Sequence, residues 1–465
     1  MNKIIGYSFF LALFLLLFKT LSTFISPLEL HGDEAQYWLW SRDLSFGYFS
    51  KPPLLPFLIK IFGLVFGSSV FGIKTLSAVF YLLTSFVIYL ISKKLFTKNI
   101  AVVTSLTFFL MPGVSFSSFI INTDVPLMFF WSASIYCLIL QKENHRVINS
   151  IFFGICLGFG MLSKYAMLYF FICFVIYLLI NKRFFDDFKN NIGHYILSFI
   201  IFLGVIAPNI YWNMSNGWLT FGHTADNINI GSIKINFVGF FNFLFAQVFI
   251  LGPLIFIAAI AYYKKIFVLS EENSFLLAFS IPVFIFVILE SFFIRAHGNW
   301  AAPAFIGLIV FLVRNLMICM PKIVLINNLI NFLLALLFFY LVMVGSSYKV
   351  FGQLHGYENF TNYLNLKTQD QKIVNIVIEE RMIFSIVNYK LRNEDLSFYV
   401  TKAPGDRVSN HFQINKALSS SFNESFIYVG GLESIGYLKK SFEIIPLKKI
   451  KINSDVGYVN VFAII

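Results

Sequence analysis

The sequence predicts an α-helical, multi-spanning membrane protein with a small α/β domain at its C-terminal end. Of its 465 residues, 58% are hydrophobic and only 12% are charged, a composition typical of membrane proteins. About eleven apolar runs reach the length of roughly 20 residues that a membrane-spanning helix requires. After about Val350 these runs give way to short strand-like segments separated by helical ones, which is the pattern of an α/β domain.

The candidate spans define the membrane part of the chain. A first run after the residues MNK lacks an A-x-A cleavage signal and is too long for a signal-peptide core, so we expect it to be a retained helix. A shorter run at 54–66 predicts an interfacial or re-entrant helix. The spans are expected near residues 4–25, 70–93, 99–118, 124–141, 148–163, 165–181, 192–209, 235–262, 273–293, 299–318 and 322–345.

Basic residues indicate how the spans are oriented. The net charge of +12 comes from residues at the ends of apolar runs, so it predicts topology rather than nucleic-acid binding. With the N-terminus inside, the cytoplasmic loops hold most of the Lys and Arg, as the positive-inside rule requires. The outer loops hold only scattered basic residues, namely Arg42, Lys51, Lys164, Lys234 and Arg295.

Two parts of the chain follow from this topology. Residues 1–348 form the membrane part, whose outer loops carry the polar residues, and residues 349–465 form a soluble domain. The odd number of spans places that domain outside. Its strand candidates are KIVNIVIEE, LSFYV and ESFIYVGG, and its helix candidates are RMIFSIVNYKL and LESIGYLKK. The four cysteines lie in or beside apolar runs without a CxxC pair, so they predict neither disulfides nor a zinc site.

The first outer loop, HGDEAQYWLWSRDLSFGYFSKPP, is unusually rich in charge. If it is helical, Asp33 and Tyr37 lie one turn apart, as do Glu34 and Trp38. Interface anchoring is the simplest interpretation of Tyr37, Trp38 and Trp40, because aromatic residues prefer the lipid–water boundary. The carboxylates need another explanation, since acids close to lipid are costly unless they have partners.

Other outer loops carry isolated polar residues that have simpler alternatives. Asp124 could cap the helix that begins near Pro126, and Lys164 could extend its amine toward the interface. Arg295 and His297 could likewise anchor a helix end. Together with Lys51, however, these side chains predict a polar site on the outer side of the membrane.

The chemistry that fits such a site is transfer from a phosphate-linked donor. The sequence has no Walker loop, GxGxxG, HExxH or GxSxG motif. Cations stabilise the charge that develops on a departing phosphate. A carboxylate can take the proton of an acceptor hydroxyl. A lipid-linked sugar phosphate would supply that leaving group on the outer side of the membrane, where nucleotide sugars are absent.

Five motifs then carry a resemblance to a known superfamily. HGDEAQYWLWSRDL with YFSKPPLLPFLI, then NTDVPLMFFW, GMLSKYAMLYF, PNIYWNMSNGWLTF and GNWAAPAF occur in this order over roughly residues 28–310. The chain resembles bacterial members of the protein O-mannosyltransferase superfamily. These include the aminoarabinose transferases and, more closely, the lipid A and core galacturonosyltransferases. Each motif is degenerate, but their order makes the resemblance fairly specific.

The resemblance implies a C-type glycosyltransferase fold and a polyprenyl-phosphate sugar donor, with no cofactor. It implies that Asp33 is the leading catalytic residue and that Asp124 is the second acid. Lys51 matches a residue near the donor phosphate. Lys164 and Arg295 are carried over as substrate-binding residues.

Glu34, Tyr37 and His297 complete the expected substrate-binding set. Ser50 stands where the aminoarabinose branch commonly has an acid, so we expect no metal here. The expected location is the bacterial inner membrane, with the site facing the periplasm. The expected partners are the lipid bilayer, the donor and an acceptor.

The acceptor is left open by the sequence. Lipid A or lipopolysaccharide core is favoured, and protein O-glycosylation is the alternative. If the acceptor is a lipid A phosphate, Asp33 would mainly position groups, whereas for a sugar hydroxyl it would be the base. A transporter or flippase of lipid-linked sugars is a weaker hypothesis, because transporters place ionisable residues near mid-membrane and contain repeats. A structural scaffold ranks last, since it leaves Asp33, Lys51 and Asp124 unexplained.

Overall fold

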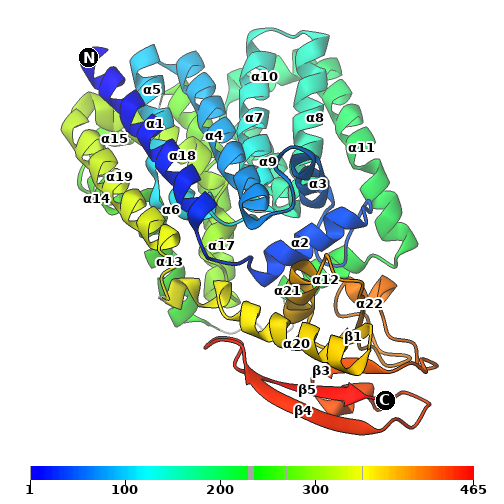
Figure 1. The fold of residues 1–465 in the computed structure, drawn as a ribbon. Coiled ribbons are helices and arrows are strands. Elements are labelled where there is room, and N and C mark those ends of the chain that lie inside the picture. Colours follow the sequence, from blue (N-terminus) through cyan, green and yellow to red (C-terminus); the bar gives the residue numbers. More distant parts are fainter. Residues whose placement is uncertain (1, 229–234, 269, 348) are drawn as a thin grey trace. The chain divides into compact units, whose positions relative to one another are not determined.

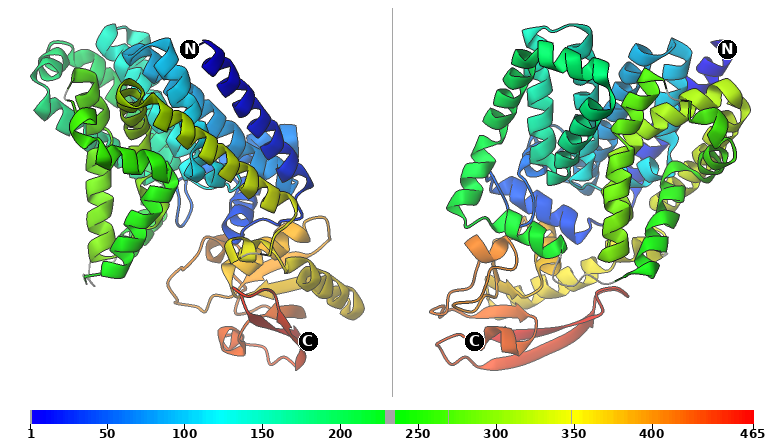
Figure 2. Two further views of the ribbon diagram at one scale, coloured as in Figure 1. Left: turned by 90° about the vertical axis from the view of Figure 1, so that its left-hand side faces the viewer. Right: turned by 180° about the vertical axis from the view of Figure 1, so that it is seen from behind.

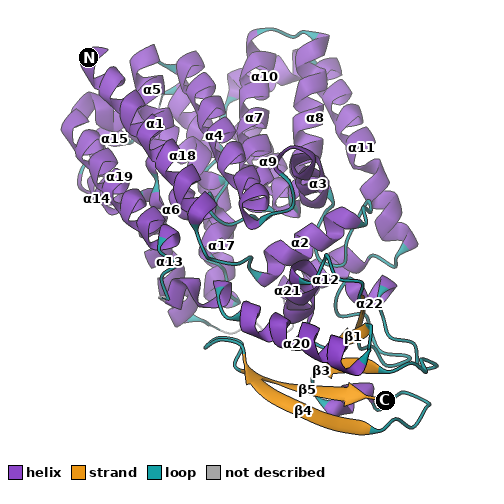
Figure 3. Ribbon diagram, in the orientation of Figure 1, coloured by secondary structure: helices purple, strands orange, loops and turns teal. Residues whose placement is uncertain are grey.

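The computed structural model describes residues 2–228, 235–268, 270–347 and 349–465 (Figure 1). Helices make up most of this part of the chain, and the strands lie after residue 374 (Figure 3). Lys234, expected in an outer loop, lies outside the described residues.

The N-terminal three quarters of the described chain are helical (Figure 2). The α-helices are α1 (Asn2–Ile25), α2 (Gly32–Arg42), α3 (Leu54–Phe66), α4 (Val70–Leu95), α5 (Lys98–Leu110), α6 (Pro112–Ser117), α7 (Asp124–Glu143), α8 (Val147–Ser163), α9 (Leu168–Ile180), α10 (Lys182–Asn190), α11 (Ile192–Ser215), α12 (Leu219–Ile228), α13 (Phe237–Leu251), α14 (Pro253–Ala261), α15 (Tyr263–Ile266), α16 (Glu271–Ala278), α17 (Ile281–Phe293), α18 (Ala304–Cys319) and α19 (Pro321–Met343). Two short 3-10 helices are η1 (Tyr165–Met167) and η3 (Gly298–Ala301).

The C-terminal quarter contains both helices and strands. Its elements are η4 (Lys349–Leu354), α20 (Tyr357–Gln371), β1 (Asn375–Ile378), α21 (Arg381–Lys390), β2 (Ser397–Val400), α22 (Phe412–Asn415), β3 (Phe426–Val429), η5 (Leu432–Ile435), β4 (Ile444–Lys451) and β5 (Tyr458–Ile464). The first three strands and α21 match the expected segments. The expected LESIGYLKK helix is only the four-residue η5.

Apolar helices identify a multi-pass membrane protein. Among the described residues, α4, α7, α11, α19 and the α16–α17 segment are long and apolar enough to cross a membrane. Two further pairs, η1–α9 with α10 and α13 with α14, pass the same test but bend by 108° and 104°. Counting each bent pair as one span gives up to seven. Shorter apolar helices such as α3, α5, α8 and α18 add to these, and the total of about eleven spans stays a prediction.

The run at 235–262 is not the continuous helix that its hydrophobicity predicts. Gly252 has a φ of 105° and ends α13, and Pro253 begins α14. Only glycine adopts this φ without strain, and proline suits a first helical position because it has no N–H to satisfy. A Cβ at residue 252 would also come within 2.9 Å of the Asn331 amide.

The described chain divides into two compact units. The first comprises Met1–Phe24, Lys51–Leu55 and Lys74–Leu341, and the second comprises Ile25–Ser50, Pro56–Ile73 and Val342–Ile465. One apolar core of the first unit joins α1, α5 and α19 through Leu15, Leu110 and Phe332. The predicted division at residues 348 and 349 stays a prediction.

The second unit is built around a five-stranded mixed sheet of order β2-β1-β3-β5-β4. β1 pairs in parallel with β2 and β3, and β5 pairs antiparallel with β3 and β4. All residues of β1 and β3 are buried, as expected for central strands covered on both faces. α20 and α21 pack against these strands, and Val377, Phe426 and Tyr428 contribute to a separate apolar cluster.

The aromatic residues of α2 lie inside the second unit. Trp40 is only 2% exposed, stacks on Tyr48 with ring centroids 4.4 Å apart and contacts the His411 ring. Trp38 is 6% exposed and contacts Tyr389 edge-on. The structure thus buries in protein two side chains that we expected to anchor the lipid–water boundary.

Burial of His411 gives the second unit a pH-dependent stability. Burial lowers the pKa of this imidazole from 6.5 to about 4, and the charge of Asp43 opposes the shift only in part. The unfolded chain therefore binds the proton more readily, so stability is full above pH 6.5 and falls as the pH drops toward 4. We expect a loss of about 2 kcal/mol between pH 7 and pH 5. Thermal unfolding of the wild type and His411→Gln at both pH values would measure it; an equal loss in both proteins would contradict the assignment.

Candidate functional site

Asp124 is the centre of a polar cluster in the first unit. It is the first residue of α7 and is 4% exposed. One carboxylate oxygen accepts a hydrogen bond from the Lys164 amine at 2.6 Å, and the other accepts from the Asn299 amide at 2.5 Å. The N-cap of α7 is Thr123, so Asp124 is the first helical residue and not the cap. The predicted alternative, a simple helix cap, therefore does not describe its contacts, although a negative charge at a helix N-terminus is favourable.

Neighbouring residues hold Lys164 in place at the end of α8. Lys164 has an extended backbone conformation and lies between the end of α8 and the start of η1. The next residue, Tyr165, donates its hydroxyl to the Asn209 side chain at 2.9 Å and stacks on Phe221 at 4.8 Å. Asn209 and Phe221 come from the PNIYWNMSNGWLTF motif, so this motif positions the lysine that contacts Asp124. The Lys164 side chain is 20% exposed, which does not fit an amine extended freely into water.

Three cations act electrostatically on His297. Burial lowers the pKa of this imidazole, and the positive charges of Arg295, Lys164 and Lys51 lower it further. His297 is therefore coupled electrostatically to these three cations. His297 precedes η3, the turn that also carries Asn299. Five predicted residues of the first unit are thus coupled, Asp124 to Lys164 by a hydrogen bond and Lys51, Lys164 and Arg295 to His297 by electrostatics; we call them the polar cluster.

Two residues of this cluster were not singled out from the sequence. Asn299 contacts Asp124 directly, and it lies inside the GNWAAPAF motif. Glu290, near the end of α17, interacts electrostatically with Lys164. The signal for Glu290 was available, because an acid inside an apolar run is a candidate functional residue by default.

Asp33 lies in the second unit, near the start of α2. Its carboxylate accepts a hydrogen bond from Arg381 at 3.0 Å, and Arg381 also donates to Gln36 at 2.7 Å. Arg381 is the first residue of α21, which packs against α2. A Cβ at Gly32 would come within 2.6 Å of Met382, so the glycine permits this close approach. The Asp33 side chain remains 38% exposed.

The other two predicted residues of α2 have structural contacts. Glu34 is fully buried and accepts a hydrogen bond from the His31 backbone N–H at 2.8 Å, while the His31 ring accepts from the Asp33 N–H. This reciprocal arrangement is a capping box that satisfies the first N–H groups of the helix. Tyr37 is 4% exposed and contacts Trp40. Their assignment to substrate binding stays a prediction.

The metal expectation also stays a prediction. Within the described ranges, no three His, Cys, Asp or Glu side chains are grouped so that they could hold a metal ion. The predicted acids are instead paired with nitrogen donors: Asp124 with Lys164 and Asn299, and Asp33 with Arg381.

Known proteins resemble this chain in both sequence and fold. Residues 50–212 match the family model described as dolichyl-phosphate-mannose-protein mannosyltransferase. The lipid A galacturonosyltransferase RgtD of Rhizobium johnstonii is 29% identical over 309 residues, which are 66% of this chain and 64% of that protein. The match therefore spans less than two thirds of the relative's length.

A solved structure covers nearly the whole chain. The crystal structure of ArnT from Cupriavidus metallidurans in the apo state matches with a TM-score of 0.68 and 12% sequence identity, over 98% of each chain. The predicted C-type glycosyltransferase fold is thus confirmed. The resemblance predicted from the motifs, to bacterial glycosyltransferases of the protein O-mannosyltransferase and aminoarabinose transferase superfamily, near its galacturonosyltransferase-like members, is confirmed as well.

Proposed function

We propose that this protein is an inner-membrane glycosyltransferase that moves a sugar from a polyprenyl-phosphate donor to lipid A or lipopolysaccharide core. The observation that carries the proposal is the hydrogen bond from Lys164 to the buried Asp124, beside which Lys51, Lys164 and Arg295 act electrostatically on His297. The resemblance to RgtD, a lipid A galacturonosyltransferase, supports the acceptor.

The cationic cluster suits the donor phosphate. In the proposed reaction, an acceptor oxygen attacks the anomeric carbon of the sugar, and the bond from that carbon to the phosphate oxygen breaks. The electron pair leaves with the polyprenyl phosphate, which gains negative charge. Fixed cations at Lys51, Lys164 and Arg295 would stabilise this charge, an effect that is strongest where water is excluded.

Asp33 is the proposed proton acceptor. Its exposed carboxylate is fixed by Arg381 and lies at the start of a capped helix. For a hydroxyl acceptor, the proton lost during attack would pass to this carboxylate. For a phosphate acceptor, which is already an anion, Asp33 would instead orient the reacting groups.

The outer side of the membrane is the proposed location of the chemistry. Basic residues favour an N-terminus in the cytoplasm, and with that orientation the loops of Lys51, Asp124 and Arg295 would face the periplasm. The segment 349–465 would then form a periplasmic domain behind a membrane part of residues 1–348. Labelling of single cysteines by a membrane-impermeant thiol reagent in intact inner-membrane vesicles of known orientation would test this arrangement.

Protein O-glycosylation is the second candidate function. The observation that favours it is the family model, whose description names a protein mannosyltransferase. Mass spectrometry of lipid A and lipopolysaccharide from a strain that lacks this protein separates the two candidates. Loss of a hexose, hexosamine or uronic acid from either glycolipid supports the first. Unchanged glycolipids with missing protein-linked glycan would support the second.

Lys51→Gln should raise the KM for the polyprenyl-phosphate sugar by about 10- to 100-fold, because a hydrogen bond to a charged group contributes about 1.5–3 kcal/mol. The measurement is the rate of sugar transfer in detergent at varied donor concentration. Lys98→Gln is the matched control, since Lys98 is an exposed cation at the start of α5. An unchanged KM in Lys51→Gln would exclude this lysine from donor binding.

His297 should act as a neutral group at pH 7. Burial and the neighbouring cations lower its pKa below the usual 6.5, so it gains a proton only under more acidic conditions. We therefore expect wild type and His297→Gln to share the same dependence of transfer rate on pH between pH 7 and pH 8.5. A wild-type step in this range that disappears in His297→Gln would contradict the assignment.

A further inference from the structure

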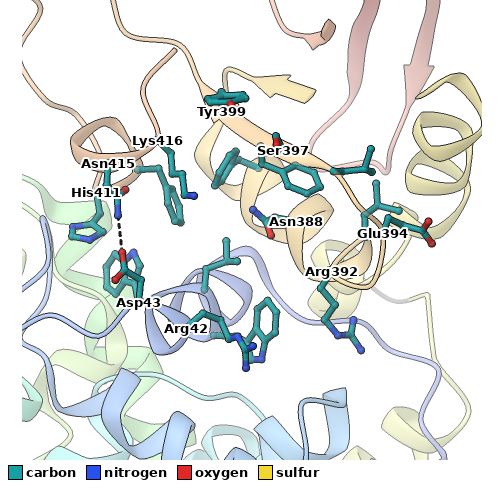
Figure 4. A pocket seen from close by; sticks show the side chains of 18 of the residues that line it. Arg42, Asp43, Asn388, Arg392, Glu394, Ser397, Tyr399, His411, Asn415 and Lys416 are labelled. Atoms are coloured by element: carbon teal, nitrogen blue, oxygen red, sulfur yellow. Dashed lines mark hydrogen bonds between the residues drawn. The ribbon is translucent and has the colours of Figure 1, made fainter. Parts of the chain in front are cut away.

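The second unit contains a large cavity to which the proposed reaction assigns no role. Its volume is about 660 Å³, within the range of roughly 300–1,000 Å³ typical of small-molecule sites. It lies between the end of α2, the C-terminal half of α21, β2 and α22 (Figure 4). No residue predicted from the sequence to bind substrate lines it.

The cavity combines an aromatic floor with polar walls. Trp38 and Phe384 are nearly buried, and Asn388 and Lys416 line the same cavity with polar side chains. Figure 4 shows Asn388 and Lys416 directed toward the space between α2 and β2. Apolar faces beside convergent polar groups are the usual means of fixing the orientation of a polar ring.

The charges at the cavity favour an anion. Arg42 ends α2, Arg392 follows α21 and Lys416 follows α22, so three separate elements each contribute a cation. Of the two lining acids, Asp43 already accepts a hydrogen bond from Asn415 at 3.1 Å (Figure 4). Arginine and lysine together are well suited to phosphate or carboxylate groups.

A smaller hollow links this cavity to an apolar helix. It has a volume of about 110 Å³, shares Trp38, Arg42 and Ser68 with the larger cavity, and is otherwise lined mainly by α3. The outer face of α3 is strongly apolar, with Leu64 82% and Val65 75% exposed. Such a face is expected to lie in lipid. A ligand held here would therefore have its polar group beside a membrane surface.

We propose that this cavity binds the phosphorylated saccharide of a lipid-anchored acceptor, through Arg42, Lys416 and the aromatic floor at Trp38. The inference rests on the proposed function, because it makes the cavity the acceptor site of that reaction. Trp38 contacts the sugar ring, and Arg42 and Lys416 contact the phosphate. The apolar face of α3 lies along the acyl chains. The cavity is thus the part of the protein that selects an anionic glycolipid.

Equilibrium binding to the full-length protein in detergent tests the proposal. The probe is an N-acetylated glucosamine disaccharide bisphosphate, and the same disaccharide without phosphates is the control ligand. We expect the bisphosphate to bind at least about tenfold more tightly than the neutral disaccharide. Arg42→Gln and Lys416→Gln should each weaken its binding by about tenfold.

Two further variants keep the test decisive. Asn388→Trp places a large ring in the cavity from a half-buried position on α21 (Figure 4) and should abolish binding. Lys367→Gln removes an exposed cation of α20 that pairs with Asp370 and should leave binding unchanged. Absence of binding to the wild type, equal binding of both ligands, or binding unaffected by Asn388→Trp would overturn the proposal.

The experiment separates this inference from the function on which it rests. Binding is measured without a donor, so it does not require transfer. Cavity-dependent binding without any sugar transfer would support the site and refute the proposed function. Transfer to lipid A without cavity-dependent binding would overturn the inference alone.

Discussion

Asp33→Asn should lower the rate of sugar transfer by about 10²–10⁴-fold, the contribution typical of a general base. Asparagine keeps the shape of the side chain and an oxygen that can accept the Arg381 hydrogen bond, but it cannot accept the proton. The pair with Arg381 is 36–38% exposed, and such pairs contribute only about 0–1 kcal/mol. The variant should therefore insert and fold normally. The measurements are transfer rate, amount of membrane-inserted protein and apparent Tm.

Asp370→Asn is the matched control for Asp33→Asn. Asp370 lies in the same unit and pairs with Lys367 at 2.8 Å on the exposed surface of α20, so its replacement should leave both transfer and Tm unchanged. A sugar-transfer rate that falls in Asp33→Asn but not in Asp370→Asn supports the assignment of Asp33 as the general base. If Asp33→Asn retains the wild-type rate, the carboxylate is not the base, and a phosphate acceptor with an orienting role for Asp33 becomes the better account.

The sequence predicted the polar cluster because its members follow the ends of apolar runs. Asp124 and Lys164 both lie at helix ends on the expected outer side, so topology alone brings them to one level of the membrane. Their direct contact at 2.6 Å goes beyond what topology predicts. The carboxylate is shared with Asn299, which lies 175 positions away. Only the packing of α7 against its neighbours decides that partner.

Arg381 was harder to predict than the residues of the motifs. It contacts Asp33 across 348 positions, and nothing in local periodicity links α2 to α21. The role of Gly32 could not be predicted from the sequence either, although the absence of a side chain at this position allows Met382 to approach. Long-range contacts of this kind depend on the tertiary fold, whereas the capping box of Glu34 with His31 follows a local pattern.

The fold was predicted best where one continuous apolar run of the sequence forms one unbroken helix. The apolar runs at α4, α7 and α19 are helices within a few residues of their expected ends. Mean hydropathy does not reveal a bend, and the 104° break between α13 and α14 was missed. The local signal was the Gly252-Pro253 pair. β4 and β5 were also missed, because β4 is an exposed edge strand with lysines that weaken its apolar pattern.

Breaking the pair of Asp124 and Lys164 should have the largest effect on stability. Asp124→Asn leaves the amine of Lys164 without its carboxylate, and Lys164→Met leaves a carboxylate that is only 5% exposed. Removing one partner of a buried ion pair typically costs about 3–5 kcal/mol, whereas replacing both is often nearly neutral. We therefore expect a clear fall in apparent Tm for each single variant and recovery of most of it in Asp124→Asn/Lys164→Met. Thermal unfolding of the purified proteins measures both.

The same double variant separates folding from chemistry. If the pair serves the donor phosphate, Asp124→Asn/Lys164→Met should regain stability but still transfer no sugar, because the cation that faces the phosphate is gone. The exposed pair of Lys94 and Glu143, also 2.6 Å apart, is the control: Lys94→Met/Glu143→Gln should change stability by less than about 1 kcal/mol and leave transfer intact. A stable and fully active Asp124→Asn/Lys164→Met protein would mean that the pair only holds α7 and α8 together, and the donor site would have to lie elsewhere.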